Sequence, residues 1–305
     1  ELGAGAWQLE RLIKIDLSGA VSRQALKIRG QGMGSTVLTT SATASAADFK
    51  DADGAYKMLS VVADGAGKND YFELSDVEFV PNFTQGGDGV TRLQDPMRAI
   101  ELVYANHCSV RSVRVFAYTL GRNGTDQFGL YVKRCYYGAV GRYKFTTFPI
   151  VGGGVGMNGN AATAWSGVAL GLEENNALHV SDLSALGCNL GVLFTTEHGA
   201  RVEGFNLENH NRGFHFENGS ANNIAERGYT EWRRFDSSGE LQVAELDSIA
   251  TFGATSHHNY VQTANSRRHG RLVARRHRFC PHRSEGCWSS GTRSAPRTPC
   301  CISSD

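Results

Sequence analysis

A four-residue phrase returns along this chain at a fixed interval of 22 residues. Each copy reads small residue, apolar residue, variable residue, apolar residue, and the copies are Ala169-Leu170-Gly171-Leu172, Gly191-Val192-Leu193-Phe194 and Gly213-Phe214-His215-Phe216. Apolar residues at alternate positions are typical of a β-strand with one buried face. A short unit that repeats at one period indicates stacked coils, because each unit buries its apolar face only against its neighbours.

A second apolar pattern follows each phrase after seven more residues and completes the repeat. It holds Val180 and Leu183 in one copy, Val202, Phe205 and Leu207 in the next and Ile224 in a third, and earlier copies of the phrase begin at Ala99 and Gly129. Strands one coil apart would pair in parallel, about 4.7–4.9 Å apart. We therefore expect Phe194 to lie over Phe216, and Val180, Val202 and Ile224 to form one column.

A set of hairpins is the alternative, since Asn218-Gly219 suits a two-residue hairpin turn and a sandwich also has short, closely spaced strands. Hairpins would not keep apolar columns at one interval over three units. The repeat therefore predicts an all-β fold, a single-stranded parallel β-helix (a solenoid) with inserted loops.

Residues 26–38, LKIRGQGMGSTVL, carry a more specific pattern. They resemble the opening coil of the pectate-lyase-like superfamily, in which an apolar-x-apolar-x-Gly-x-Gly-x-Gly-Ser-Thr phrase recurs, and residues 15–262 share the rhythm of that superfamily. The resemblance is strongest to phage tailspikes and polysaccharide depolymerases, and it implies a right-handed parallel β-helix. The same glycines superficially suggest a phosphate cradle, but the Lys-Ser/Thr of a Walker loop is missing.

Two insertions interrupt the repeat, because the phrase spacing grows to 30 residues after Ala99 and to 40 after Gly129. The surplus should leave the tube as loops near residues 118–127 and 146–166, and loops on a rigid scaffold often carry binding residues. The resemblance implies a groove for a long polysaccharide, walled by such loops. The expected substrate-binding residues are Trp165, Tyr118, Phe148 and Asn158. The aromatic residues here, Phe128 included, could equally cap a small core of the loops themselves.

Carboxylates on the coils are the catalytic candidates, since glycoside hydrolysis needs an acid and a base or nucleophile. We expect Glu217 with His215 to act, followed by Glu203 and Glu226, and Glu173 to lie two coils beneath Glu217. Outward Glu and His side chains are also common as solvated surface. No Asp-rich cluster of the kind found in calcium-dependent pectate lyases occurs on the repeating strands, so we expect a hydrolase rather than such a lyase, with no metal and no cofactor.

The composition changes near residue 266. Residues 266–305 hold nine Arg, no Lys and two acidic residues, together with four of the seven Cys. An Arg-rich end could bind nucleic acid, but it lacks Lys and abandons the repeat, so no nucleic-acid partner is expected. We expect a β-helix domain over residues 1–265, truncated at its N-terminus, and a disordered or frame-shifted tail over 266–305.

Two functional classes follow. The first is a polysaccharide-binding and polysaccharide-degrading enzyme, a glycoside hydrolase or polysaccharide lyase acting on a cell-surface or plant cell-wall glycan. The second is a non-catalytic β-helical spike or tail-fibre protein that binds a surface glycan. The resemblance to tailspikes implies a homotrimer and an extracellular or virion-tail location. No apolar stretch is long enough to cross a bilayer, and the first residues carry no signal-peptide pattern.

Overall fold

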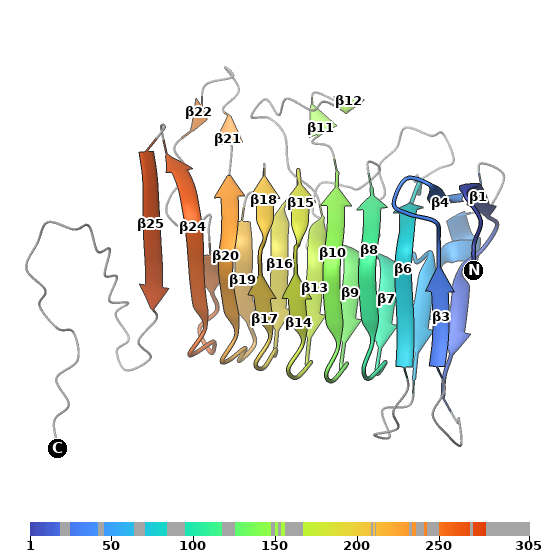
Figure 1. The fold of residues 1–305 in the computed structure, drawn as a ribbon, viewed down its shortest axis with the longest axis horizontal. Coiled ribbons are helices and arrows are strands. Elements are labelled where there is room, and N and C mark those ends of the chain that lie inside the picture. The colour runs from blue at the N-terminus through green and yellow to red at the C-terminus, as the bar shows by residue number, and fades with distance from the viewer. Residues whose placement is uncertain are drawn as a thin grey trace, which may run out of the picture.

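The computed structural model describes residues 1–18, 25–41, 46–63, 71–83, 95–117, 126–147, 150–151, 154–155, 167–208, 210, 212–231, 234–235, 241–242, 250–268 and 271–278. The chain forms a tube of stacked coils that starts at the right of Figure 1 and grows toward the left. A thirteen-stranded sheet, here the front sheet, faces the viewer, and an eight-stranded rear sheet lies behind it. Among the described residues, no helix has the length and apolar character that a membrane crossing requires.

Each coil contributes strands to both sheets. The rear sheet contains β2 (Ile13–Asp16), β5 (Leu59–Val62), β7 (Met97–Val103), β9 (Gln127–Lys133), β13 (Val168–Glu173), β16 (Leu190–Thr195), β19 (Arg212–Glu217) and β23 (Ala250–Phe252). The front sheet contains β1 (Gly5–Leu9), β3 (Ala25–Arg29), β4 (Thr36–Thr40), β6 (Tyr71–Val80), β8 (Ser109–Phe116), β10 (Ala139–Thr146), β14 (His179–Ser181), β15 (Ser184–Leu186), β17 (Arg201–Glu203), β18 (Asn206–Glu208), β20 (Ile224–Glu231), β24 (Tyr260–Arg268) and β25 (Arg271–Arg278). Outside them lie a 3-10 helix (Ala46–Phe49) and the two hairpins β11 (Ile150–Val151) with β12 (Gly154–Val155) and β21 (Arg234–Phe235) with β22 (Leu241–Gln242).

The repeated phrase forms the rear-sheet strands, which pair in parallel in the expected register. Leu130, Leu170, Val192 and Phe214 are successive partners along β9, β13, β16 and β19. The front strands from β6 to β24 run upward in Figure 1, and the chain passes down the rear sheet and returns through turns at the lower edge. Because each coil lies to the left of the one before it, this path is right-handed, as crossover connections between parallel strands are. The right-handed parallel β-helix is confirmed, and with it the resemblance at the level of the fold.

The small residue that opens each phrase is explained by close packing inside the tube. A Cβ on Gly129 would lie 2.4 Å from the hydroxyl oxygen of Tyr143, and one on Gly191 would lie 2.5 Å from the carbonyl oxygen of Gly213. Ala169 occupies the same position in β13 and is fully buried. The first two residues of the phrase therefore both face inward, and only a small side chain fits at the first.

The expected aromatic column is confirmed. The rings of Phe194 and Phe216 stack with centroids 4.4 Å apart, and Phe216 stacks in turn on Phe252 at 5.1 Å. All lie in one continuous core that runs through the tube. Ring stacking adds a specific contact to the burial of apolar area, so this column stabilises the coils from β16 to β23.

The expected column of Val180, Val202 and Ile224 is only partly correct. Val180 pairs with Val202, but Val202 pairs with Ala225, and Ile224 lies beside Arg201. Ile224 is 36% exposed, whereas Ala225 is buried. The turn after β19 contains one residue more than the turn after β16, and this shifts the next inward position from 224 to 225.

Buried hydrogen bonds join the turns at the lower edge, which connect rear to front strands. The backbone N–H groups of Cys135, Asn175 and Glu197 donate to the side chains of Asn175, Glu197 and Ser220, each on the next coil, at 2.8, 2.8 and 3.1 Å. Asn223 and Asn259 form a second ladder of the same kind. Each coil thus supplies the acceptor that the turn before it needs.

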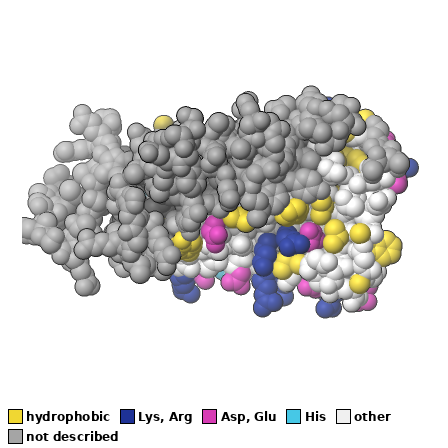
Figure 2. Space-filling model, turned by 90° about the horizontal axis from the view of Figure 1, so that it is seen from above, with side chains coloured by type: hydrophobic (Ala, Val, Ile, Leu, Met, Phe, Trp, Pro, Cys, Tyr) yellow, Lys and Arg dark blue, Asp and Glu magenta, His cyan; other side chains and the backbone are white. Residues whose placement is uncertain are grey.

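The insertions and the C-terminal part are described only in pieces. The hairpin of β11 and β12 lies in the second insertion. The expected domain boundary at residue 266 falls inside β24, which continues to Arg268 and pairs antiparallel with β25; residues 279–305 lie outside the described residues. Seen from above, the described side chains form small, interspersed groups of hydrophobic, basic and acidic type (Figure 2).

Candidate functional site

The outer face of the rear sheet carries a polar strip along the tube, here called the rear strip. It occupies two outward columns, one through Ser60, Glu101, Tyr131, Gly171, Leu193, His215 and Thr251 and the other through Lys133, Glu173, Thr195 and Glu217. The first column is the variable position of the repeated phrase. Period-two alternation places every one of these side chains on the side away from the core.

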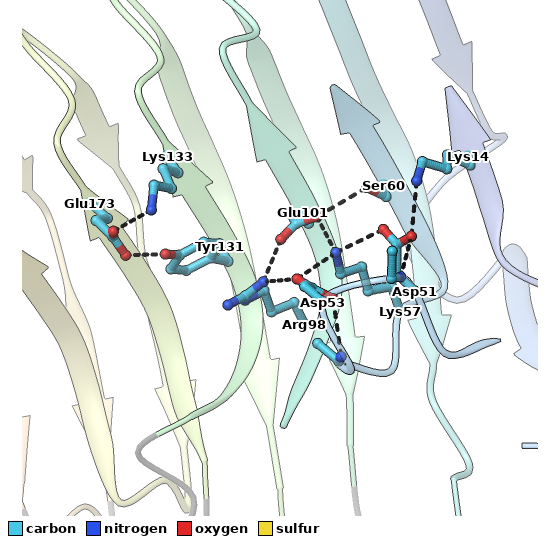
Figure 3. Close-up of polar contacts among 12 residues, drawn as sticks. Lys14, Asp51, Asp53, Lys57, Ser60, Arg98, Glu101, Tyr131, Lys133 and Glu173 are labelled. Carbon is cyan, nitrogen blue, oxygen red and sulfur yellow. Dashed lines mark hydrogen bonds and ion pairs between the residues drawn. The ribbon is translucent and has the colours of Figure 1, made fainter. Parts of the chain in front are cut away.

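At the N-terminal end of the rear strip, Lys57 is surrounded by carboxylates (Figure 3). Its ammonium group lies 2.6 Å from Glu101 Oε2 and 3.0 Å from Asp51 Oδ2 and Asp53 Oδ2, although its side chain is only 2% exposed. Arg98 binds Glu101 at 2.8 Å and Asp53 at 2.5 Å. A buried charge is tolerated when it is paired and hydrogen-bonded. The cluster is therefore a compensated ion network, which joins the loop before β5 to β7.

The pKa values in this network shift in the directions that ion pairing requires. Burial opposes the charged form of Asp51, but hydrogen bonds from Lys14, from the Ala52 backbone N–H and from Lys57 hold the pKa of Asp51 well below its usual range. Burial likewise acts to lower the pKa of Lys57, but its contacts with Glu101 and the two Asp residues raise it overall. Asp51 and Lys57 therefore stay charged at neutral pH, so neither is poised to transfer a proton.

The middle of the rear strip is held by Tyr131 and Glu173 (Figure 3). The Tyr131 hydroxyl donates to Glu173 Oε2, and Lys133 Nζ lies 2.5 Å from Glu173 Oε1. The Arg98 guanidinium lies over the Tyr131 ring, 4.5 Å from its centroid, and thus links this part to the Lys57 network. Burial and the hydrogen bond to Glu173 raise the pKa of Tyr131, so it remains a neutral donor. Glu173 is held in a fixed position with a cation beside it.

The C-terminal part of the rear strip contains Glu217 and His215 on β19. Glu217 Oε1 accepts a hydrogen bond from the Thr195 hydroxyl at 3.0 Å, and its Oε2 lies 3.4 Å from His215 Nε2. A hydrogen bond of 2.6 Å joins His215 Nδ1 and Thr251 Oγ1. Burial lowers the pKa of His215, and the Glu217 carboxylate opposes this only in part. A neutral imidazole therefore lies beside Glu217 at neutral pH.

Glu173 and Glu217 occupy the same column on strands two apart, with Thr195 between them, as expected from the repeat. Two strand spacings amount to about 9.6 Å. Glu217 bonds Thr195 and Glu173 bonds Tyr131 and Lys133, in each case toward the preceding coil, so the backbone spacing is the guide to the gap between the two carboxyl groups. Side-chain exposures of 22% and 34% leave both groups reachable from solvent.

The four expected catalytic residues do not form one site. His215 and Glu217 lie together on the rear sheet, whereas Glu203 and Glu226 are neighbours on the front sheet. There Arg201 binds Glu203 and lies 2.6 Å from Glu226 Oε1. The front pair is thus bridged by a cation on the opposite wall of the tube.

The expected substrate-binding residues Trp165, Tyr118, Phe148 and Asn158 all lie outside the described residues. Phe128, which flanks the first insertion, belongs to a second apolar cluster on the outside of the rear sheet, formed by Phe128, Tyr131, Val168, Leu190 and Leu193. Its ring and that of Tyr131 lie directly over Gly171, where a Cβ would be 2.6 Å from Phe128. With 6% of its surface exposed, Phe128 caps a small external core, which is formed by residues of the rear-sheet strands and not by the loops themselves.

Two features of the rear strip were not predicted from the sequence, the Lys57 network and the Tyr131–Glu173 contact. One signal was available, since Glu101, Tyr131 and His215 all stand at the variable position of the repeated phrase. Lining up that position across the copies would have predicted an outward polar column. The loop residues Asp51 and Asp53 stand outside the repeat, so no such comparison would have found them.

No protein-family model matches this sequence, and no curated protein sequence does. Solved structures are similar in fold, among them Geobacillus virus E2 ORF18, which is 9% identical over 91% of this chain and 56% of its own, with a TM-score of 0.36. An endo-xylogalacturonan hydrolase from Aspergillus tubingensis is 8% identical over 84% of this chain and 83% of its own, with a TM-score of 0.36. The catalytic domain of a GH87 alpha-1,3-glucanase in complex with nigerose is 10% identical over 85% and 60%, with a TM-score of 0.29. This chain thus spans little more than half of the viral protein, and each likeness concerns the fold alone.

Proposed function

We propose that this protein hydrolyses a polysaccharide on the outer face of the rear sheet, with Glu173 and Glu217 as its catalytic pair. The observation that carries the proposal is the placement of two solvent-reachable carboxyl groups in one column, two strands apart. Inverting glycosidases use carboxyl groups about 6.5–9.5 Å apart, which leaves room for the attacking water. Two strand spacings, about 9.6 Å, place the pair at the upper end of this range without any special loop.

The surroundings of the two groups favour different roles. Glu173 is paired with Lys133 and accepts the Tyr131 hydroxyl, which suits a carboxylate that removes a proton from water. Glu217 lies beside the neutral His215 and the Thr195 hydroxyl, which suits the group that protonates the leaving glycosidic oxygen. His215 is a positioning residue, since Thr251 fixes its ring against Glu217. Glu203 and Glu226 are not part of this pair.

The test is an assay of the full chain on capsular, lipopolysaccharide and pectic polymers, which measures new reducing ends and unsaturated sugars separately. Glu173→Gln and Glu217→Gln should each lower kcat by about 10²–10⁴-fold, the usual contribution of a general acid or base. Glu226→Gln, an acid-to-amide change on the opposite wall, is the matched control and should leave kcat unchanged.

Equal loss in all three variants, or loss only in Glu226→Gln, would contradict the assignment. Unsaturated ends formed together with the new reducing ends would make the protein a lyase, because β-elimination creates one of each at every cleavage, whereas hydrolysis creates reducing ends alone. Binding without cleavage of any polymer would favour the second class, a non-catalytic spike that holds a glycan.

The proposed substrate also bears on location and assembly. A cell-surface or cell-wall polymer is reached from outside the cell or from a virion, so we place the protein there. A homotrimer, as in tailspikes, is part of the same proposal, and the mass of the full chain in light scattering tests it.

A further inference from the structure

The turns at the lower edge of the tube form a row, here called the turn ridge, which is mostly exposed apart from the buried Ala221. Its first column is Tyr136, Asn176, His198, Ala221 and His257, which pair coil to coil as parallel bridges. Its second column is His107, Tyr137, Ala177, Gly199, Asn222 and His258, which share the left-handed backbone conformation of the turn. No Asp, Glu, Lys or Arg occurs in either column.

Charged residues flank this row on both sides. Toward the rear sheet, Arg134 and Glu174 form an ion pair across neighbouring turns. Toward the front sheet, Arg201 binds Glu203 and Glu226. The turn ridge therefore carries no carboxylate, ammonium or guanidinium group of its own, so a bound polymer would find hydroxyl, amide and imidazole groups there and none of these counter-ions.

Two tyrosines expose their rings on the turn ridge. Tyr137 is 69% exposed and Tyr136 is 38% exposed. His107, one coil earlier, stacks on Tyr137 with ring centroids 5.6 Å apart and an interplanar angle of 17°. The His107 ring thus covers one face of the Tyr137 ring, and most of the remaining Tyr137 side chain is exposed to solvent. A tyrosine presents an apolar face together with a hydroxyl group, which suits a sugar ring with its apolar faces and hydroxyl rim.

The turn ridge also runs beside the candidate catalytic column. Asn176 follows Glu173 by three residues, and Ala221 follows Glu217 by four. A chain lying along the ridge would therefore be parallel to the rear strip, coil by coil. The amide of Asn176, exposed one coil after Tyr136, would meet the hydroxyl groups of the next sugar.

We propose that the turn ridge is a second glycan-binding surface, which takes an uncharged stretch of polysaccharide along the tube axis with Tyr136 and Tyr137 as its stacking platform. The ligand class rests on the proposed function. Binding at the ridge needs neither Glu173 nor Glu217, so the two proposals can fail separately.

Affinity electrophoresis of the full chain tests this, with dextran, galactomannan or xyloglucan in the gel as neutral probes and polygalacturonate as the acidic probe. At least one neutral polymer should retard the wild type, and the Tyr136→Ala/Tyr137→Ala double variant should bind it about tenfold more weakly. Tyr137→Phe, which keeps the ring, should bind nearly as well as the wild type. Trp7→Ala removes another exposed ring, 46% exposed on β1, and should leave binding unchanged.

The proposal is overturned if no neutral polymer retards the wild type, if only polygalacturonate does, or if the double variant binds as the wild type does. It is also overturned if the double variant changes the mass in light scattering but not the binding, because the ridge would then be a contact between copies of the chain. Melting temperatures of all variants show that they fold. Retained binding by an inactive Glu217→Gln variant supports the ridge, and neutral-glycan binding without any cleavage would remove only the proposed hydrolysis.

Discussion

Glu197 is the one acidic member of the ladder that joins Cys135, Asn175 and Ser220. Its side chain is fully buried, and its Oε2 accepts from both the backbone and the side-chain amide of Asn175. Burial raises the pKa of Glu197 to about 8, and the hydrogen bonds from Asn175 oppose this only in part. At neutral pH the folded protein therefore holds a proton on Glu197 that the unfolded chain releases.

On its own, this proton makes stability fall as pH rises, whereas the buried neutral His210 acts in the opposite direction below its ordinary pKa of 6.5. Between the ordinary Glu pKa of 4.5 and about 8, the folded state binds more protons than the unfolded state, so the free energy of unfolding decreases by up to about 1.4 kcal/mol per pH unit. The contribution of the Glu197 proton to stability is fully present below pH 4.5 and is lost above about pH 8. Glu197→Gln is neutral at every pH and should remove this slope. Urea unfolding at pH 5, 6.5 and 8 measures the free energy of unfolding. The gain in this free energy of the variant relative to the wild type should be largest at pH 8.

The matched control is Glu208→Gln, a carboxyl on the outer side of β18. It should keep the slope of the wild type. If Glu197→Gln loses stability with pH as steeply as the wild type does, Glu197 is charged in the folded state and this account of the ladder is wrong.

At the scale of the strand, the four-residue phrase explains which parts of the strand register could be predicted from the sequence and which could not. The pattern predicts the rear-sheet register from β7 to β19, because inward apolar residues define it and a slip of one residue would reverse the faces. It failed at Ile224 because one additional residue in a turn shifts the pattern without disturbing the strands. The phrase could not predict the Lys57 network, because Asp51 and Asp53 lie in a loop outside the repeat.

The first position of the phrase gives a test of the inward packing. Gly191→Val should lower the free energy of unfolding by about 1–3 kcal/mol, the usual cost of overpacking. The new Cβ would meet the Gly213 carbonyl oxygen at 2.5 Å, and backbone cannot rotate away as a side chain can. Gly141→Val is the control, since a Cβ there meets only the Ser181 hydroxyl, at 3.3 Å. Equal urea midpoints for the two variants would show that the small residue is not required.

At the scale of the whole molecule, the coil is the unit of stability, and it also sets the distance between the carboxyl groups of the candidate site. Each coil contacts only its neighbours, so a solenoid tolerates changes in the number of its coils better than changes in the length of one. The gap between Glu173 and Glu217 is set by the single coil between them, which begins at β16. The backbone repeat, rather than a loop conformation, thus fixes the distance between the proposed acid and base.

Deleting residues 190–211 removes that coil and joins Asn189 to Arg212, which is the partner of Leu190 in the register. The shortened protein should still fold, because β13 then meets β19 with the same inward and outward positions. Circular dichroism should show an unchanged β spectrum and a cooperative melt, whereas deleting only residues 190–200 should abolish the melt because the columns no longer align.

In the shortened protein, however, the separation of Glu173 and Glu217 falls from two strand spacings to one, about 4.8 Å. This separation leaves no room for a water molecule between the two carboxyl groups. Release of reducing ends should therefore fall as far as in Glu217→Gln, although the protein is folded. A folded deletion protein with wild-type kcat would contradict the proposed inverting reaction of Glu173 and Glu217.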